Sequence, residues 1–168
     1  MKKISMILSL CLICFSLAAC DPGPVSHYRS EGVADEVVGI ELINYHNQET
    51  KIINTIISTR AIRAFDFDKM EIIEELDTEK LGDFLQDFSE VNIWSRWIHP
   101  DSPVDISIRI IYDSGDFEVI SCVNTDEEVI SFLARYNSKG KMVKHIGTVE
   151  NRSEFVDIVN RYFTTQIK

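Results

Sequence analysis

Apolar and polar residues alternate along much of the chain, which predicts β-strands. The longest alternation covers residues 104–112, with apolar side chains at every second position. A turn containing Gly115 and a second apolar run at 117–123 follow, so these two strands are expected to form a hairpin. The other strands are expected at 37–45, 70–76, 92–98, 129–136 and 141–147, the last two forming a second hairpin.

Two segments instead repeat apolar residues at the i, i+3, i+4, i+7 spacing of an amphipathic helix. The first stripe consists of Leu81, Phe84, Leu85 and Phe88, and the second of Phe155, Ile158, Val159, Tyr162 and Phe163. Asp77 or Thr78 is the expected N-cap of the first helix. Asn151 and Glu154 have the spacing of a capping box at the start of the second helix.

Hairpins combined with two amphipathic helices predict an α+β fold. We expect a single domain with an antiparallel sheet of about five to seven strands and both helices packed on one face. Residues 46–68 leave two alternatives open, because the isoleucines at 52–57 suit a strand or one face of a short helix. A long, partly ordered connection is expected there.

The first twenty residues have the layout of a secretory signal. Lys2 and Lys3 precede an apolar run at 4–17, which is too short to span a membrane as a helix. With Leu17-Ala18-Ala19-Cys20 at its end, the segment resembles the signal of bacterial lipoproteins. That resemblance implies that Cys20 is acylated and becomes the first residue of the mature chain. The alternatives are a signal that is uncleaved or conventionally cleaved before an ordinary cysteine, and a buried N-terminal helix.

The lipoprotein resemblance divides the chain into a signal peptide at 1–19, a flexible tether at 20–34 and one α+β domain at 35–168. Asp21-Pro22-Gly23-Pro24 opens the tether. Two acyl chains anchor a protein stably where one does not. The folded part is therefore expected on the extracytoplasmic face of the cell membrane. In enteric-type lipoproteins an aspartate after the acylated cysteine favours the inner membrane, and Asp21 fits that pattern.

Composition excludes some partners. The formal net charge is -10, and loss of Lys2 and Lys3 with the signal changes it to -12. Such an acidic chain is poorly suited to nucleic acid, because binding there depends on lysine and arginine. Cys11 and Cys14 leave with the signal and Cys20 is acylated, so Cys122 is the last thiol and no intrachain disulfide is expected.

Motifs that carry catalysis are largely missing from the sequence. It contains no phosphate-binding glycine loop, no paired metal-ligand motif and no nucleophile elbow. Ser138 and Lys141 match Ser-x-x-Lys, but they fall on an expected hairpin turn rather than at a helix start. The histidines, His27, His46, His99 and His145, are scattered, and solvated positions are the simpler interpretation. Cys122 is interpreted as a small buried hydrophobe in a strand.

The acidic residues Asp66, Asp68 and Glu71 are the candidate metal ligands. Oxygen ligands at such spacing suit calcium, but the segment lacks the central glycine and alternating pattern of an EF-hand loop. A solvated acidic edge, which also discourages aggregation between sheets, is the competing interpretation. No cofactor is expected.

The body of the chain is similar to small single-domain lipoproteins of low-GC Gram-positive bacteria that have no established activity. The similarity lies in residues 65–71, 112–118 and 136–147. It implies no site residues.

We therefore expect a protein that is not an enzyme. The first hypothesis is a lipid-anchored interaction module that binds an envelope protein or small ligand through an exposed sheet face carrying aromatic residues. Those aromatics are Trp94, Trp97, Tyr112 and Tyr136, with Tyr112 also expected in the core. The alternatives are a lipoprotein that binds a cation or small solute at its acidic edge, and a cell-envelope hydrolase.

Overall fold

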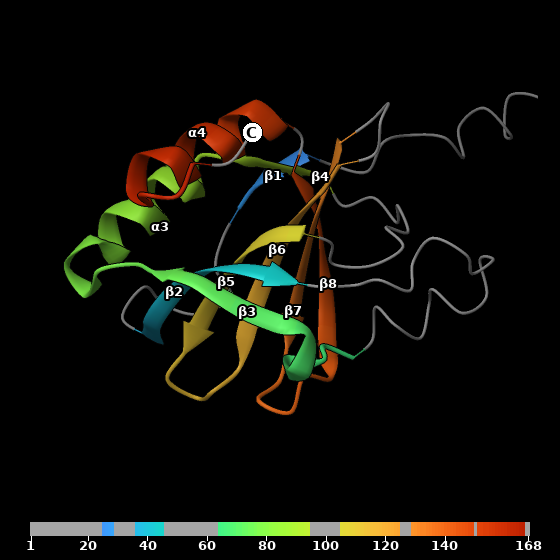
Figure 1. The fold of residues 1–168 in the computed structure, drawn as a ribbon. Coiled ribbons are helices and arrows are strands. Elements are labelled where there is room, and N and C mark those ends of the chain that lie inside the picture. The colour runs from blue at the N-terminus through green and yellow to red at the C-terminus, as the bar shows by residue number, and fades with distance from the viewer. Residues whose placement is uncertain are drawn as a thin grey trace, which may run out of the picture.

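The computed structural model describes residues 25–28, 36–45, 64–94, 105–124, 129–149 and 151–166. Within these ranges the chain forms one antiparallel sheet of eight strands together with two α-helices (Figure 1). The expected α+β class is confirmed. The expected count of five to seven strands was wrong.

The strands lie in the order β1-β4-β8-β7-β6-β5-β2-β3 across the sheet. Their bounds are Val25–His27 for β1, Val37–Tyr45 for β2, Met70–Glu75 for β3, Asn92–Trp94 for β4, Asp105–Tyr112 for β5, Phe117–Asn124 for β6, Val129–Tyr136 for β7 and Met142–Val149 for β8. Every pair of neighbours is antiparallel. The two expected hairpins, β5 with β6 and β7 with β8, are confirmed.

Strand β1 corrects the expected tether. Val25–His27 pairs with β4, and the next residue, Tyr28, is only 2 % exposed. A three-residue strand is too short to show alternation, so the proline-rich start of the segment dominated the sequence pattern. The folded part of the chain therefore includes residues 25–28.

The β7 to β8 turn requires glycine at residue 140. Gly140 has a φ of 76°, and a Cβ there would lie 2.3 Å from the carbonyl oxygen of Phe65. The Phe65 N–H donates to the Gly140 carbonyl at 2.6 Å, which explains the close approach. This contact fixes the start of residues 64–69 against the turn. Residues 46–63, where strand and helix were both considered, lie outside the described ranges.

The two α-helices are α3, Leu81–Ser89, and α4, Arg152–Tyr162. Lys80 occupies the N-cap of α3, so the expectation of Asp77 or Thr78 was wrong. The reason is a 3-10 turn, Thr78–Lys80, whose first carbonyl accepts the Leu81 N–H. At α4 the expected cap is confirmed, since the Asn151 side chain accepts the Ser153 N–H.

Buried apolar residues form two clusters. The larger core contains residues of both helices and of the sheet: Tyr28, Val37, Ile40, Leu42, Leu76, Phe84, Leu85, Phe88, Val91, Ile93, Ile108, Ile110, Tyr112, Ile120, Leu133, Val149, Phe155, Ile158, Val159 and Phe163. The smaller core contains Ile43, Tyr45, Phe65, Phe117, Val119, Ala134 and Tyr136. Neighbouring residues of one strand, such as Leu42 and Ile43, belong to different clusters because successive side chains point to opposite faces.

Candidate functional site

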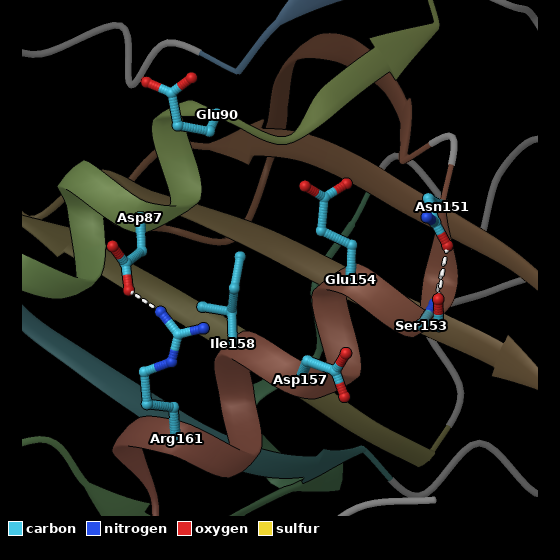
Figure 2. A pocket seen from close by; sticks show the side chains of 8 residues that line it. All are labelled: Asp87, Glu90, Asn151, Ser153, Glu154, Asp157, Ile158 and Arg161. Atoms are coloured by element: carbon cyan, nitrogen blue, oxygen red, sulfur yellow. Dashed lines mark hydrogen bonds and ion pairs between the residues drawn. The ribbon is translucent and has the colours of Figure 1, made fainter.

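A groove of about 450 Å³ runs between α3 and α4 (Figure 2). Its lining residues are Asp87, Glu90, Asn151, Ser153, Glu154, Asp157, Ile158 and Arg161. All but Ile158 are polar or charged, and four of the eight are acidic. The groove is therefore a polar space between two helices rather than an apolar pocket.

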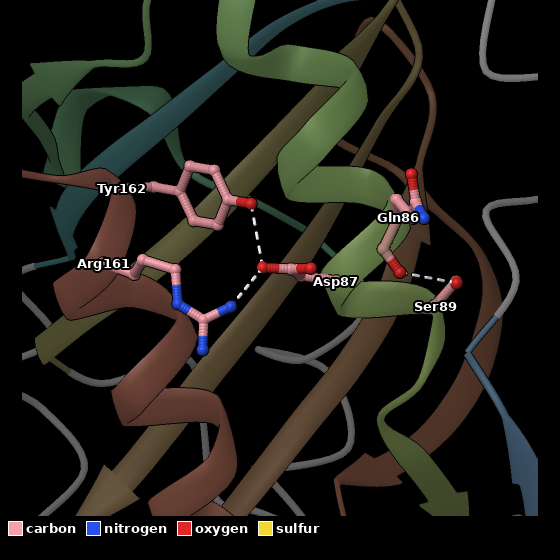
Figure 3. A network of polar contacts seen from close by, with 5 residues as sticks. All are labelled: Gln86, Asp87, Ser89, Arg161 and Tyr162. Carbon is pink, nitrogen blue, oxygen red and sulfur yellow. Dashed lines mark hydrogen bonds and ion pairs between the residues drawn. The ribbon is translucent and has the colours of Figure 1, made fainter.

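One end of the groove is closed by a polar contact between the helices (Figure 3). Asp87 on α3 accepts hydrogen bonds from Arg161 and, at 2.8 Å, from the Tyr162 hydroxyl on α4. Burial, and then the Asp87 carboxylate, raise the pKa of Tyr162 above its usual range. The hydroxyl thus stays a hydrogen-bond donor throughout the neutral range.

The other carboxylates of the groove are those of Glu90, Glu154 and Asp157. None of the three carboxylates forms a hydrogen bond or ion pair with another side chain that the structure describes. The Arg161 guanidinium already pairs with Asp87, so it offsets little of their charge. A cationic group would fit this groove electrostatically.

A second polar arrangement joins β3 to the end of α4. Glu74 accepts the N–H of Thr164 at 2.8 Å and the N–H of Thr165 at 3.0 Å. Slight burial acts to raise the pKa of Glu74, but these hydrogen bonds outweigh it, and the pKa is lowered. At neutral pH Glu74 is therefore ionised, and its carboxylate oxygens are already hydrogen-bonded to backbone N–H groups. This arrangement suits a structural role.

A buried carboxyl group lies in the larger core. The Glu118 side chain is 0 % exposed, and its Oε2 accepts a hydrogen bond from the Tyr28 hydroxyl at 2.5 Å. Its Oε1 and the Tyr112 hydroxyl are also buried, and neither has a hydrogen bond of normal geometry in the described part of the chain, although the hydroxyl lies close enough to act on the carboxyl group. Burial raises the pKa of Glu118, although Tyr28, Tyr112 and Arg135 act in the opposite direction.

Arg135 supplies the positive charge next to this carboxyl. Its guanidinium lies 4.5 Å from the centroid of the Tyr112 ring, a cation–π arrangement. It also lies 3.7 Å from the Asp116 carboxylate. Glu118 is therefore a buried acid that faces two tyrosines and an arginine from three different segments.

The outer strand β3 carries exposed apolar residues. Ile72 is 43 % exposed and Ile73 is 37 % exposed, and Phe67 in the turn before β3 is 39 % exposed. In the described part of the chain β3 pairs with β2 alone. Its other edge is not paired with any described strand.

The candidate metal ligands do not converge. Asp66, Asp68 and Glu71 are all exposed. The Asp66 side chain accepts the Asp68 N–H at 3.2 Å, as the N-cap of a short turn, and lies 4.0 Å from the Lys69 ammonium. No group of three or more histidine, cysteine or acidic side chains is placed to hold a metal ion within the described ranges.

The expected aromatic patch is not formed by the tyrosines. Tyr112 and Tyr136 are buried, which confirms the core interpretation of Tyr112 and corrects the exposed interpretation of Tyr136. Both point into the cores because the strand alternation aligns them with buried isoleucine and alanine side chains. Trp94 is half-buried. Trp97 lies outside the described residues.

The other residues singled out from the sequence have ordinary surroundings or lie outside the described ranges. Ser138 and Lys141 are exposed at the β7 to β8 turn. His27 is exposed and His145 half-buried. Cys20, His46 and His99 are not among the described residues. Cys122 lies in β6, and its side chain is not described.

Sequence reasoning missed the pair of Tyr28 and Glu118. The sequence does contain a signal for Glu118. It lies two residues before Ile120, so both side chains point to the same face of the strand, where an apolar residue is expected. Tyr28 carries no comparable signal, since it stands alone among polar residues.

Comparison with protein-family models, with curated proteins and with solved structures finds no match. Within the described ranges, neither α-helix has the length and apolar character needed to cross a membrane.

Proposed function

We propose that the chain is a lipid-anchored, non-catalytic interaction module of the cell envelope, displayed on the extracytoplasmic face through acylated Cys20. The observation that carries the binding role is the outer strand β3, where Ile72 and Ile73 stay exposed beside an edge that no described strand covers. The signal-like sequence ending at Cys20 supports the anchor.

We also propose that both helices pack on one face of the sheet, so that the fold has two layers. Both helices contribute to the larger core, and neither contributes to the smaller core. This division supports helices packed on one face of the sheet. Such packing leaves the edges of the sheet accessible, and β3 is the edge strand that carries exposed isoleucines.

The edge of β3 suits an extended partner segment. Strand addition satisfies the open backbone groups of an edge strand and uses alternate side chains for specificity. Exposed isoleucines would supply apolar contacts with that segment. Proteins normally protect such an edge with charge, and here Glu71 and Glu75 flank the isoleucines without covering them.

Charge selects the kind of partner. When two β3 strands pair antiparallel with Ile72 opposite Ile73, Glu71 falls opposite Glu74, and like charges placed opposite are destabilising. The exposed carboxylates of Glu71 and Glu75 would favour lysine or arginine on the added strand. We therefore assign β3 to an extended, basic segment of another envelope protein rather than to a second copy of this chain.

A second candidate function is the binding of a cationic solute. It is favoured by the groove between α3 and α4, which Glu90, Glu154 and Asp157 line (Figure 2). An organic ammonium group suits it better than a metal ion, because the described carboxylates do not converge on one point. Isothermal titration with spermidine, comparing the soluble mature chain with Glu154→Gln, tests this candidate.

Site-specific photo-crosslinking on intact cells tests the interaction module. A photoreactive residue replaces Ile73 in one strain and Val143 in another. Val143 is a matched control, because it is also an exposed apolar strand residue, 62 % exposed, but lies on β8, which does not pair with β3. We expect one discrete adduct from position 73, mapping to a basic segment of the partner, and none from position 143. Equal labelling from both positions, or no adduct at 73, would contradict the proposal.

A further inference from the structure

We propose that residues 25–28 form a detachable latch, in which Tyr28 occupies the buried site around Glu118 and leaves it without unfolding of the rest of the sheet. Detachment lengthens the connection between the folded part and the N-terminus. That detachment lets the folded part lie farther from the membrane rests on the proposed anchor at Cys20. The latch itself does not depend on the anchor.

Of the three side chains described in this segment, only that of Tyr28 is buried, and the His27 ring lies 3.3 Å from the Glu90 carbonyl. Strand β1 contributes three paired residues at the end of the sheet, and Ser26 and His27 are exposed. Tyr28, in contrast, is buried, and its N–H donates to the Val91 carbonyl at 2.8 Å. Its ring meets Phe88 edge-on at 4.6 Å between centroids. Short terminal elements with few buried contacts are the parts of a protein that open locally.

The receiving site is polar at its centre. Glu118 accepts the Tyr28 hydroxyl through one carboxyl oxygen, while the other oxygen and the Tyr112 hydroxyl are buried without a hydrogen bond of normal geometry in the described part of the chain. If Glu118 served only to pack the core, an apolar side chain would be favoured in its place, since buried polar groups without partners are unfavourable. Departure of Tyr28 admits water, which satisfies all of these groups. The site therefore tolerates both the docked and the open state.

Opening is coupled to a proton. The groups that face Glu118 are Tyr28, Tyr112 and Arg135, and Arg135 in turn pairs with Asp116. Burial raises the pKa of Glu118, so the docked state holds its proton more tightly than an open, hydrated state does. Detachment is accordingly favoured as the pH rises.

The latch changes the reach of the tether. Cys20 precedes Val25 by five residues, and an extended chain covers at most about 3.5 Å per residue, so the docked state allows roughly 17 Å. When the latch opens, the next described residue held by the sheet is Glu36, sixteen residues after Cys20, and the upper limit becomes roughly 56 Å. A partner farther from the membrane surface then comes within range.

Hydrogen exchange on the soluble full-length mature chain, made with Cys20→Ser, tests the latch. The test compares wild type with Tyr28→Phe, which keeps the ring and removes the hydroxyl. The matched control is Tyr162→Phe, which removes the other hydrogen bond from a tyrosine to a carboxylate, that to Asp87. We expect residues 25–28 to exchange at least tenfold faster in Tyr28→Phe, with β5 and β6 unchanged. Tyr162→Phe should leave residues 25–28 unchanged.

A cross-linked variant keeps the test decisive if Tyr28→Phe is poorly folded. His27 and Asn92 are register partners, so His27→Cys with Asn92→Cys, in a Cys122→Ser background, closes the latch by oxidation. Oxidation should slow exchange at residues 25–28 to the rate of β5 and β6, and reduction should restore the faster rate. If residues 25–28 of the reduced protein exchange only as slowly as β5 and β6, the segment opens only with global unfolding and the proposal is overturned.

The membrane consequence has a separate readout. The acylated protein, in phosphatidylcholine vesicles with a headgroup-labelled acceptor, carries a donor dye on a C-terminal tag. Energy transfer should fall in Tyr28→Phe relative to wild type, and equal transfer in a vesicle-bound protein overturns the spacing role. Failure of the protein to bind vesicles at all contradicts the anchor instead, and leaves the exchange result as the measure of the latch.

Discussion

At the scale of single residues, backbone conformation decides which glycines can be replaced by alanine without loss of stability. Gly140→Ala should lower the free energy of unfolding by about 1–3 kcal/mol, because the residue has a positive φ and its Cβ would approach the Phe65 carbonyl. Gly82→Ala should raise it by about 0.5–1 kcal/mol, since Gly82 lies in α3 with open space around it. Urea denaturation of the soluble mature chain measures both changes. Equal effects of the two substitutions would refute this explanation.

The buried acid makes stability depend on pH. The native pKa of Glu118 is raised above its unfolded value, so the native state binds the proton more tightly. This favours the native state below the unfolded pKa of about 4.3, and the advantage disappears as the pH rises through the native pKa. Glu118→Gln cannot ionise and still offers Tyr28 an acceptor. The difference in unfolding free energy, wild type minus variant, should fall between pH 4 and pH 8, and a flat difference would show that folding does not shift the pKa of Glu118.

Individual side chains were the least predictable part of the site. The sequence correctly identified Tyr112 as a core residue, because strand alternation alone decides that. It did not predict the contact between Tyr28 and Glu118, since ninety residues separate them and only the strand order brings them together. The metal hypothesis for Asp66, Asp68 and Glu71 relied on sequence proximity, which does not determine whether oxygens converge.

At the scale of elements, α4 depends on its cap. Asn151 accepts the Ser153 N–H at 3.2 Å, so Asn151→Ala should cost about 1 kcal/mol of unfolding free energy. Asn151→Asp keeps the acceptor and places a negative charge at the helix N-terminus, which the helix dipole favours. Denaturation midpoints of the two variants should therefore differ clearly. A midpoint for Asn151→Asp as low as that for Asn151→Ala would rule out the capping account.

The contact between α3 and α4 consists of two unequal parts. Arg161 is well exposed, so Arg161→Ala should cost less than about 0.5 kcal/mol. Tyr162 is half-buried, and Tyr162→Phe should cost about 0.5–1.5 kcal/mol through the lost hydrogen bond to Asp87. Denaturant titration ranks the two variants. A larger loss in Arg161→Ala would mean that charge, rather than the tyrosine hydrogen bond, joins the helices.

Long elements were predictable, and the shortest one without a pattern of its own was not. The alternation at 104–112 corresponds to β5, Asp105–Tyr112, and the second helical stripe corresponds to α4. A strand was also expected at 92–98, and β4, Asn92–Trp94, lies in that range. Strand β1 was missed, because its three residues form a strand through pairing with β4 rather than through their own pattern. The predicted start of α3 was also wrong. The residue types that cap an α-helix also cap a 3-10 turn, so the sequence does not show which of the two begins there.

At the scale of the whole molecule, fold class followed from the order of hairpins and helices, while strand order and strand number did not. Hairpins predict which neighbours pair, but the positions of β1, β4 and β2 depend on pairings between distant segments. The exposed edge at β3 is a consequence of that order. It is also the feature on which the proposed interaction depends.

The functional account depends on display at the membrane through Cys20. Mass spectrometry of the N-terminal peptide, from protein purified out of its native host, tests this most directly. We predict a mature chain that begins at Cys20 and carries a diacylglyceryl group, and a Cys20→Ser chain that carries none. A chain that begins elsewhere, or an unmodified Cys20, would contradict the account.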